Sequence, residues 1–224
     1  MAPGTQDFVG DPRNSTCMNS ALSIALGDCT DLPPGKIASI VTYLEMRSRP
    51  SPRAGASFPG LALLRLTGRD MGRYLSIYRT LGERWLWWSR LELSPASLAL
   101  LLDDRAIEAF SLTHDGEDVG LLELDFRRHP AAELAFFGLV EPMIGTGTGR
   151  WLMERAIERA WHRKPSRFLV HTCTFDHPGA LEFYRRSGFA PYRFAIEFAD
   201  DPRLTGVLPR SAGPHVPLLA PAAP

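Results

Sequence analysis

The chain has 224 residues, 45% hydrophobic and 22% charged, a composition that suffices for one well-buried globular core with short extensions. Lysine plus arginine equal aspartate plus glutamate at 25 each, so no net field draws the protein toward nucleic acid or an anionic membrane surface. The three cysteines, Cys17, Cys29 and Cys173, are odd in number and widely spaced, which excludes a disulfide framework and predicts free thiols in a reducing compartment.

Targeting signals are weak in this sequence. No apolar run approaches the roughly 20 residues that a helix needs to span a bilayer. The stretch MNSALSIALGDC from Met18 lacks a basic n-region, and Asp28 stands where a lipoprotein signal needs a small residue. We therefore expect a cytoplasmic protein with no membrane contact. Residues 1–34 are predicted to be a flexible leader, within which Met18 is an alternative start.

The first elements predicted along the chain are two strands and a helix. Residues 36–46 (KIASIVTYLEM) form a β-rich run with few exposed positions and predict a strand. Residues 47–60 are rich in Pro, Ser, Gly and Arg and predict a loop, followed by a short strand over 61–66. Thr67 is predicted to cap a helix over 68–85, whose apolar residues recur at helical spacing.

A second helix and three strands come next. Ser94-Pro95 places an N-cap serine before a proline at the first helical position, which predicts a helix over 94–104. The hydrophobic period then changes to two. Residues 106–113 and 117–126 predict a hairpin across His114-Asp115-Gly116, and 132–140 predicts a third strand.

The last part of the chain begins with the glycine loop GTGTG (145–149) and an amphipathic helix. Residues 167–174 predict a strand, Pro178 and Gly188 bracket a short helix, and 191–198 predicts a closing strand. Residues 201–224 hold six prolines and are predicted to form an extended tail over the surface.

The glycine loop carries the first chemical signal. Gly145, Gly147 and Gly149 precede a helix, so several backbone N–H groups and the positive end of a helix dipole are exposed without Cβ atoms in the way. That arrangement suits a diphosphate. Arg150 stands where a Rossmann motif needs glycine, and no Gly-Lys-Ser/Thr of a P-loop is present. The alternative is that the glycines only permit a tight strand-to-helix turn.

A second motif, HPGALEFYRRSGF (177–189), favours a diphosphate site over a simple tight turn. Together with residues 140–151 it resembles the GNAT superfamily of acetyl-CoA-dependent N-acetyltransferases. The matching positions are Val140, Pro142, Gly147, Gly149, Ala180, Tyr184, Gly188 and Phe189. Two positions depart from the superfamily pattern, because Ile144 replaces an arginine or glutamine and His177 replaces the usual asparagine.

The resemblance spans roughly residues 61–198 in element order. It implies an α/β fold of α+β type over residues 35–200, with a central mixed, mostly antiparallel twisted sheet. We expect about six to seven strands, including the extra N-terminal strand, flanked by about four helices.

The resemblance also implies an acetyl-CoA site. Backbone N–H groups of the loop would bind the diphosphate, and Arg150 would add positive charge. Ile144, which lacks a polar group, would make this binding weaker. His177 would meet the cofactor arm, or alternatively cap its own helix. A free backbone N–H near Leu139 and Val140, where the third strand separates from its neighbour, would polarise the thioester carbonyl. The expected cofactor contacts are Leu139, Val140, Ile144, Gly145, Thr146, Gly147, Thr148, Gly149, Arg150 and His177.

Two residues are candidate catalysts. The resemblance makes Tyr184 the general acid for the departing thiolate, since a phenol with an ordinary pKa of about 10 is protonated at neutral pH. The alternative is a tyrosine that only packs its helix on the sheet. Glu123 is the first choice of general base, although a surface or salt-bridged carboxylate is the competing interpretation. His171 and Cys173 are more simply read as packed core residues.

The acceptor side carries less information. Asp125 lies on the same strand face as Glu123 and is a candidate substrate contact. Three tryptophans lie between residues 85 and 88; we expect Trp85 or Trp87 to be buried and Trp88 to be nearer the substrate.

The sequence therefore predicts an N-acetyltransferase that moves acetyl from acetyl-CoA to a primary amine of a small molecule, by direct attack in a ternary complex. No metal is expected, and the protein would be a monomer or homodimer. Two alternatives stay open: an acyl-CoA-binding regulatory domain without turnover, and an acyltransferase for longer acyl chains.

Overall fold

The computed structural model describes residue 27, residues 29–51 and residues 58–221. The chain divides into two compact units, Met1–Leu32 and Pro33–Pro224. Most of the predicted leader (1–34), and residues 52–57 of the predicted loop, lie outside the described residues. The fold below is that of the second unit.

The second unit is built on one sheet of seven strands, in the order β2-β3-β4-β5-β6-β1-β7. Neighbouring strands are antiparallel except for the parallel pair β5–β6. This confirms the mixed, mostly antiparallel sheet, with the N-terminal strand inserted between β6 and β7. The strands are β1 Lys36–Met46, β2 Leu61–Leu66, β3 Ile107–His114, β4 Glu117–Asp125, β5 Ala131–Leu139, β6 Arg167–Cys173 and β7 Ala190–Asp200.

Four α-helices flank the sheet, as predicted, and begin where local signals place them. The Ser94 Oγ accepts the Ser97 N–H at 3.1 Å, and Pro95 occupies the first helical position of α2. Gly147, with a left-handed backbone, is the N-cap of α3. The helices are α1 Met71–Gly82, α2 Pro95–Asp103, α3 Thr148–His162 and α4 Ala180–Arg186, with 3-10 turns at Gly68–Asp70, Glu83–Trp85 and Glu141–Met143. None of the described helices is long and apolar enough to cross a membrane.

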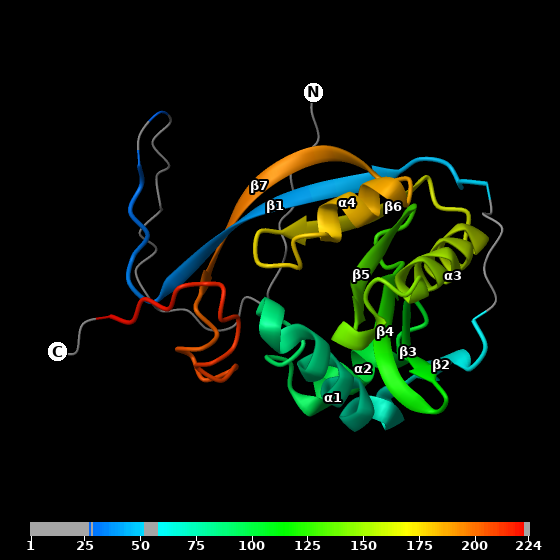
Figure 1. Cartoon of the computed structure of the whole chain (residues 1–224), viewed down its shortest axis with the longest axis horizontal. Helices are drawn as coiled ribbons and strands as arrows, with labels where there is room; N and C mark the ends of the chain where they lie inside the picture. The colour runs from blue at the N-terminus through cyan, green and yellow to red at the C-terminus, as the bar shows by residue number, and fades with distance from the viewer. Residues whose placement is uncertain (1–26, 28, 52–57, 222–224) are drawn as a thin grey trace. The chain divides into compact units, whose positions relative to one another are not determined.

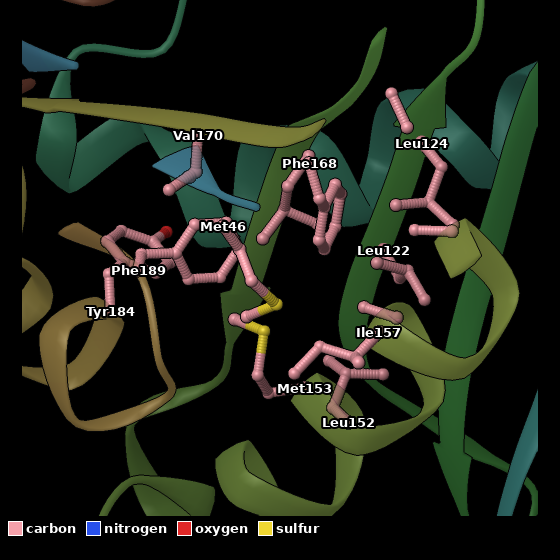
Figure 2. Close-up of a cluster of buried hydrophobic side chains, with 14 of the residues drawn as sticks. Met46, Leu122, Leu124, Leu152, Met153, Ile157, Phe168, Val170, Tyr184 and Phe189 are labelled. Carbon is pink, nitrogen blue, oxygen red and sulfur yellow. The ribbon is translucent and has the colours of Figure 1, made fainter. Parts of the chain in front are cut away.

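The larger core lies between one face of the sheet and α3 and α4. Leu122 and Leu124 of β4 and Phe168 and Val170 of β6 meet Leu152 and other apolar residues of α3 (Figure 2). Alternate residues of a strand point to the same face, so the period of two places this whole set on one side. Tyr184 and Phe189 close the cluster from α4 and the turn behind it (Figure 2).

A second core lies on the opposite face, beneath α1 and α2 (Figure 1). Tyr74 and Tyr78 of α1 are fully buried there with Leu98 and Leu102 of α2. Two sheet faces covered by helices of different chain segments give the layered architecture that an α+β sheet needs to bury its strands.

The sheet opens between its two central strands. The parallel register of β5 and β6 covers four pairs, from Ala131↔Arg167 to Leu134↔Val170, although β5 continues to Leu139. On its other side, β5 pairs with β4 from Glu133 to Leu139 but shifts register between Leu124↔Leu134 and Glu123↔Phe136, which leaves Ala135 as an extra residue. A bulge of this kind bends its strand. The second half of β5 therefore separates from β6.

The proline-rich tail is not extended. Residues 201–221 form a series of turns around Arg203, whose side chain is 2% exposed. The guanidinium donates two hydrogen bonds to Asp201, at 2.9 and 2.6 Å, and others to carbonyls, including that of Val216 at 2.7 Å. The tail also returns to the start of the sheet, because Gly35 donates to the Leu219 carbonyl at 3.1 Å. The prediction of an extended tail was wrong, because the buried Arg203 guanidinium binds the carbonyl groups of the turns.

Removing the Arg203 cation should unfold the tail. Arg203→Met leaves the Asp201 carboxylate buried without its partner, so we expect a loss of about 3–5 kcal/mol in the free energy of unfolding, measured with urea. Arg210→Met changes an exposed arginine of the same segment and should cost less than about 0.5 kcal/mol. Equal losses in both variants would contradict a special role for Arg203.

The same pair predicts a pH dependence. Burial alone would raise the pKa of Asp201, but the hydrogen bonds and charge of Arg203 outweigh it and lower the pKa below its ordinary 3.8. The stabilisation is therefore present above pH 3.8 and is lost as pH falls through the folded-state value. The difference between wild type and Arg203→Met should shrink over that acidic range.

Candidate functional site

The glycine loop has the backbone shape that the sequence predicts. Gly145 and Gly147 have φ of 84° and 94°, in the left-handed region that favours glycine. The Thr146 Oγ1 donates to the Met143 carbonyl at 2.9 Å and lies 2.8 Å from the Thr148 Oγ1. The two threonines therefore hold the loop from inside; Thr148 is buried, so its side chain serves the loop itself.

The loop ends at the N-terminus of α3, a 15-residue helix. Its first N–H groups lack intrahelical acceptors and its dipole favours negative charge there. Arg150 is exposed on the first turn and adds a formal charge, whereas Ile144, 46% exposed, contributes an apolar side chain. The arrangement is suited to an anion such as a diphosphate.

Phe58 is a neighbour of the loop that the sequence did not reveal. A Cβ built at Gly147 would lie 2.9 Å from the Cζ of Phe58, so a side chain there would push the Phe58 ring aside, and the φ of 94° favours glycine in any case. Phe58 lies near the end of the predicted 47–60 loop, 89 residues before Gly147, so no local pattern connects the two.

The separated half of β5 presents backbone N–H groups toward the opening. The Val140 N–H is donated to the Val119 carbonyl at 2.9 Å, so the expectation that it is free is wrong. Because N–H groups alternate in direction along an antiparallel strand, those of Phe137 and Leu139 point away from β4, toward the side that β6 has left. Of the two predicted donors, Leu139 has the suitable orientation.

Tyr184 lies on α4 beside this opening. Its ring is buried against Phe137, Phe183 and Phe189, with centroids 6.4, 5.7 and 6.1 Å away. Figure 2 shows it beside Phe189. Burial, reinforced by the charge of Asp176, raises the pKa of Tyr184 above its ordinary value of 10.0. The phenol is therefore protonated at neutral pH and is a proton donor, while its ring also packs the helix against the sheet.

His177 has the capping contact that was its alternative interpretation. Its Nδ1 accepts the Gly179 N–H at 3.0 Å, at the start of α4. The exposed imidazole also meets the edge of Trp85, with centroids 5.4 Å apart. A cofactor contact through the rest of the ring stays a prediction.

Glu123 lies in a closed polar network. It is 0% exposed, and its two oxygens accept hydrogen bonds from the Tyr74 hydroxyl and the Arg90 Nη2, each at 2.6 Å. Burial and the charge of Glu123 raise the pKa of Tyr74, so the phenol remains a donor. Arg90 also lies 4.8 Å from the centre of the Phe136 ring. These contacts favour the salt-bridged reading of Glu123 over that of a general base, because neither oxygen is open to a proton from the substrate.

The predicted acceptor contacts, Asp125 and Trp88, have different partners in the structure. Asp125 binds Arg127 through both carboxylate oxygens, with a shortest distance of 2.6 Å. Trp88 packs against a third cluster formed by Ile37, Leu86, Phe175, Leu208 and Ala212. All three tryptophans are half-buried, and Trp87 is the one beside Phe136, with ring centroids 5.2 Å apart. The expectation of one buried tryptophan was wrong, and Leu86 is buried instead.

A histidine and a carboxylate meet at the point where the strands separate. His171 is the first residue of β6 after its last pair with β5, and its Nδ1 lies 3.3 Å from the Oε1 of Glu133. Burial alone would lower the pKa of His171, but Glu133, with smaller contributions from Asp176 and Glu197, raises it. Glu133 and Asp125 are paired in register, so the side chains of Glu133, Asp125 and His171 lie on one face of the sheet. Two surface hollows, of about 380 and 540 Å³, contain none of these residues.

A loop suited to an anion, an interrupted parallel pair and a protonated tyrosine are features expected of an acyltransferase. Residues 74–189, 116 of the 224, match the family described as Acetyltransferase (GNAT) family. The chain therefore belongs to this family.

Solved structures share the fold at low sequence identity. A GCN5-related N-acetyltransferase from Kribbella flavida is 16% identical, with a TM-score of 0.52 over 77% of this chain and 63% of that one. Another from Sphaerobacter thermophilus is 15% identical, with a TM-score of 0.55 over 75% and 52%. This chain thus spans between half and two thirds of their lengths. Comparison with curated proteins gives no significant match.

Placing a methyl group in the loop should weaken cofactor binding. Gly145 and Gly116 both have positive φ, and a Cβ at either would meet nothing within 4 Å. Gly145→Ala and Gly116→Ala therefore impose similar backbone strain, but only the first changes the anion site. In calorimetric titrations with acetyl-CoA we expect weaker binding for Gly145→Ala and wild-type affinity for Gly116→Ala. Equal affinities in the two variants would place the diphosphate elsewhere.

Replacing Glu123 should destabilise the fold. Glu123→Gln leaves the Arg90 charge buried without a counter-ion, so we expect a loss of about 3–5 kcal/mol in the free energy of unfolding. Asp125→Asn on the same strand breaks a partly exposed pair and should cost less than about 1 kcal/mol. A Glu123→Gln protein of wild-type stability with reduced turnover would instead restore Glu123 as the general base.

Proposed function

We propose that this protein transfers an acetyl group from acetyl-CoA to a primary amine of a small molecule, by direct attack in a ternary complex. The observation that carries the proposal is the opening between β5 and β6, which ends at the glycine loop of α3. A thioester arm laid along β5 would bring its diphosphate to the loop and its carbonyl to the inward N–H of Leu139.

The Leu139 N–H supplies the polarising donor in this proposal. A fixed backbone donor stabilises the oxyanion that forms as the amine attacks, and it needs no reorganisation during the reaction. Phe137 offers a second N–H of the same direction two residues earlier, farther from the glycine loop and therefore toward the acyl end of the thioester.

His171 is the general base in this proposal, in place of Glu123. Attack requires a neutral amine, and Glu133 raises the pKa of His171 above its ordinary 6.5, which makes the neutral imidazole a stronger proton acceptor. Glu133 orients the imidazole through Nδ1 and stabilises its charged form. Its position at the strand opening supports access to the amine, directly or through one water.

Direct attack is supported by the state of the nearest thiol. Burial raises the pKa of Cys173 to about 11, so the thiol is protonated at neutral pH and is a poor nucleophile for an acyl-enzyme intermediate. Tyr184 then donates a proton to the departing thiolate of coenzyme A.

The acceptor is assigned to small molecules because formal positive and negative charges balance at 25 each, with no excess to attract a charged polymer. Asp125 would attract the ammonium form of the acceptor, and Trp88 would border its path. A cytoplasmic location, where acetyl-CoA is available, fits this role.

A domain that binds acyl-CoA without turnover is the second candidate. The engagement of His177 in its own helix cap and of Glu123 with Arg90 favours it. Release of free coenzyme A from acetyl-CoA across a panel of primary amines tests the two: amine-dependent thiol release supports the transferase, whereas tight binding without release supports the binding domain. Faster release from a longer acyl-CoA would identify an acyltransferase of that chain length.

Tyr184→Phe should lower turnover and leave cofactor affinity unchanged. The substitution keeps the ring that packs against Phe137 and Phe189 but removes the proton donor. We expect a decrease in kcat of roughly 100-fold or more with an unchanged Kd for acetyl-CoA. Unchanged turnover would leave Tyr184 with a packing role alone.

The pH dependence of kcat/KM should report on His171. Protonated His171 cannot accept a proton, so activity should rise with pH through a value above 6.5. Glu133→Gln removes the charge that raises this pKa and should move the rise to lower pH, and His171→Gln should abolish it. A rise that stays in place in Glu133→Gln would exclude the pair.

A further inference from the structure

β7 is an edge strand of 11 residues, paired in the sheet with β1 alone. The Thr174 N–H donates to the Ile40 carbonyl, so the backbone N–H and C=O of Ile40 point toward β6. Because these groups alternate in direction along a strand, those of Ser39 and Val41 point toward β7. Their register partners, Ala195 and Glu197, therefore face β1. Phe194, Ile196 and Phe198 present their N–H and C=O groups to the outside.

An apolar stripe follows this edge. Phe194, Ile196 and Phe198 are 69%, 48% and 41% exposed, and Ile40, the register partner of Ile196, is 54% exposed. The stripe lies on the outermost strands of the sheet, where β1 and β7 run side by side (Figure 1). Natural sheets protect long edges with charges, proline or bulges. The central part of β7 has no proline, and its two charged residues lie on the opposite face from the stripe, although Tyr192 is displaced by a bulge near its start.

The opposite face of β7 carries one charge of each sign. Arg193 and Glu197 are four residues apart, about 13 Å along an extended strand, so they do not reach each other within one chain. Neither makes an ion pair with another described residue; the Arg193 guanidinium lies 3.8 Å from the centre of the Tyr43 ring. Midway between them is Ala195.

We propose that a second copy of this chain binds along β7, with the two β7 strands antiparallel about a twofold axis at Ala195. In this register Arg193 opposes Glu197 of the second copy, and the reverse pair forms on the other side of the axis. Phe194 opposes Ile196 of the second copy, and these residues carry the outward backbone groups that the new ladder needs. An axis at Arg193 or at Glu197 would instead oppose like charges.

The pairing explains why an edge with exposed phenylalanines is also charge-balanced. An isologous interface uses one patch twice, so a cation and an anion equidistant from the axis make two pairs from two residues. The stripes of both copies become continuous across the joined sheets. The proposal does not depend on the acetyltransferase activity.

Charge reversal tests the proposal on the full chain. The wild type should have a mass of twice 24.8 kDa by light scattering. Arg193→Glu and Glu197→Arg each oppose like charges and should raise the dimer dissociation constant by roughly tenfold or more, whereas the double variant should restore it. A monomeric wild type, or single variants that dimerise like the wild type, would overturn the proposal and leave the stripe to another partner.

A cross-link tests the register. Opposed Ala195 residues form a non-hydrogen-bonded pair whose Cα separation of about 4.5 Å permits a disulfide. Ala195→Cys should form a covalent dimer on mild oxidation, and Ala199→Cys on the same strand face should not exceed the wild-type background. Equal cross-linking of both variants would overturn the twofold axis at Ala195.

Discussion

The candidate site depends on one interruption of hydrogen bonding, because β5 keeps β6 as a partner over only four residues. The extra residue Ala135 bends β5 at the point where pairing ends. From there β5 leads to the loop and α3, while β6 leads to α4 and Tyr184. The inward N–H of Leu139, the His171–Glu133 pair and the N-terminal end of α3 all border the same opening. A fully paired sheet would occupy these backbone groups and close the site.

The opening also separates two kinds of environment. On the face of α3 and α4, Tyr184 lies among apolar and aromatic side chains, which keep its phenol protonated. On the face of α1 and α2, charged residues lie along the same strands, with Glu123, Asp125 and Glu133 each beside a cationic or imidazole partner. The proton donor in the proposed reaction is thus held on the drier side and the proton acceptor on the more polar side.

Local signals in the sequence predicted nearly all of the fold. Every strand and α-helix lies where periodicity, caps and turns place it, and the loop glycines have the positive φ that their spacing suggests, because these features depend on neighbours along the chain. Contacts between distant segments were not predictable. Tyr74 and Arg90 lie 49 and 33 residues from Glu123, and four strands of the sequence separate Phe58 from Gly147. The prolines of the tail predicted an extended segment, because no local sequence pattern shows that the Arg203 guanidinium donates hydrogen bonds to carbonyl groups of the tail.

The bond between Gly35 and Leu219 gives the folded unit a further property. Gly35 donates to the Leu219 carbonyl and accepts the N–H of Asp201, so the chain enters and leaves this unit at one place. A unit with adjacent ends can be inserted into a surface loop of another protein, or have its ends joined and be reopened elsewhere, without stretching its sheet. Segments attached before and after residues 33–221 would therefore begin side by side.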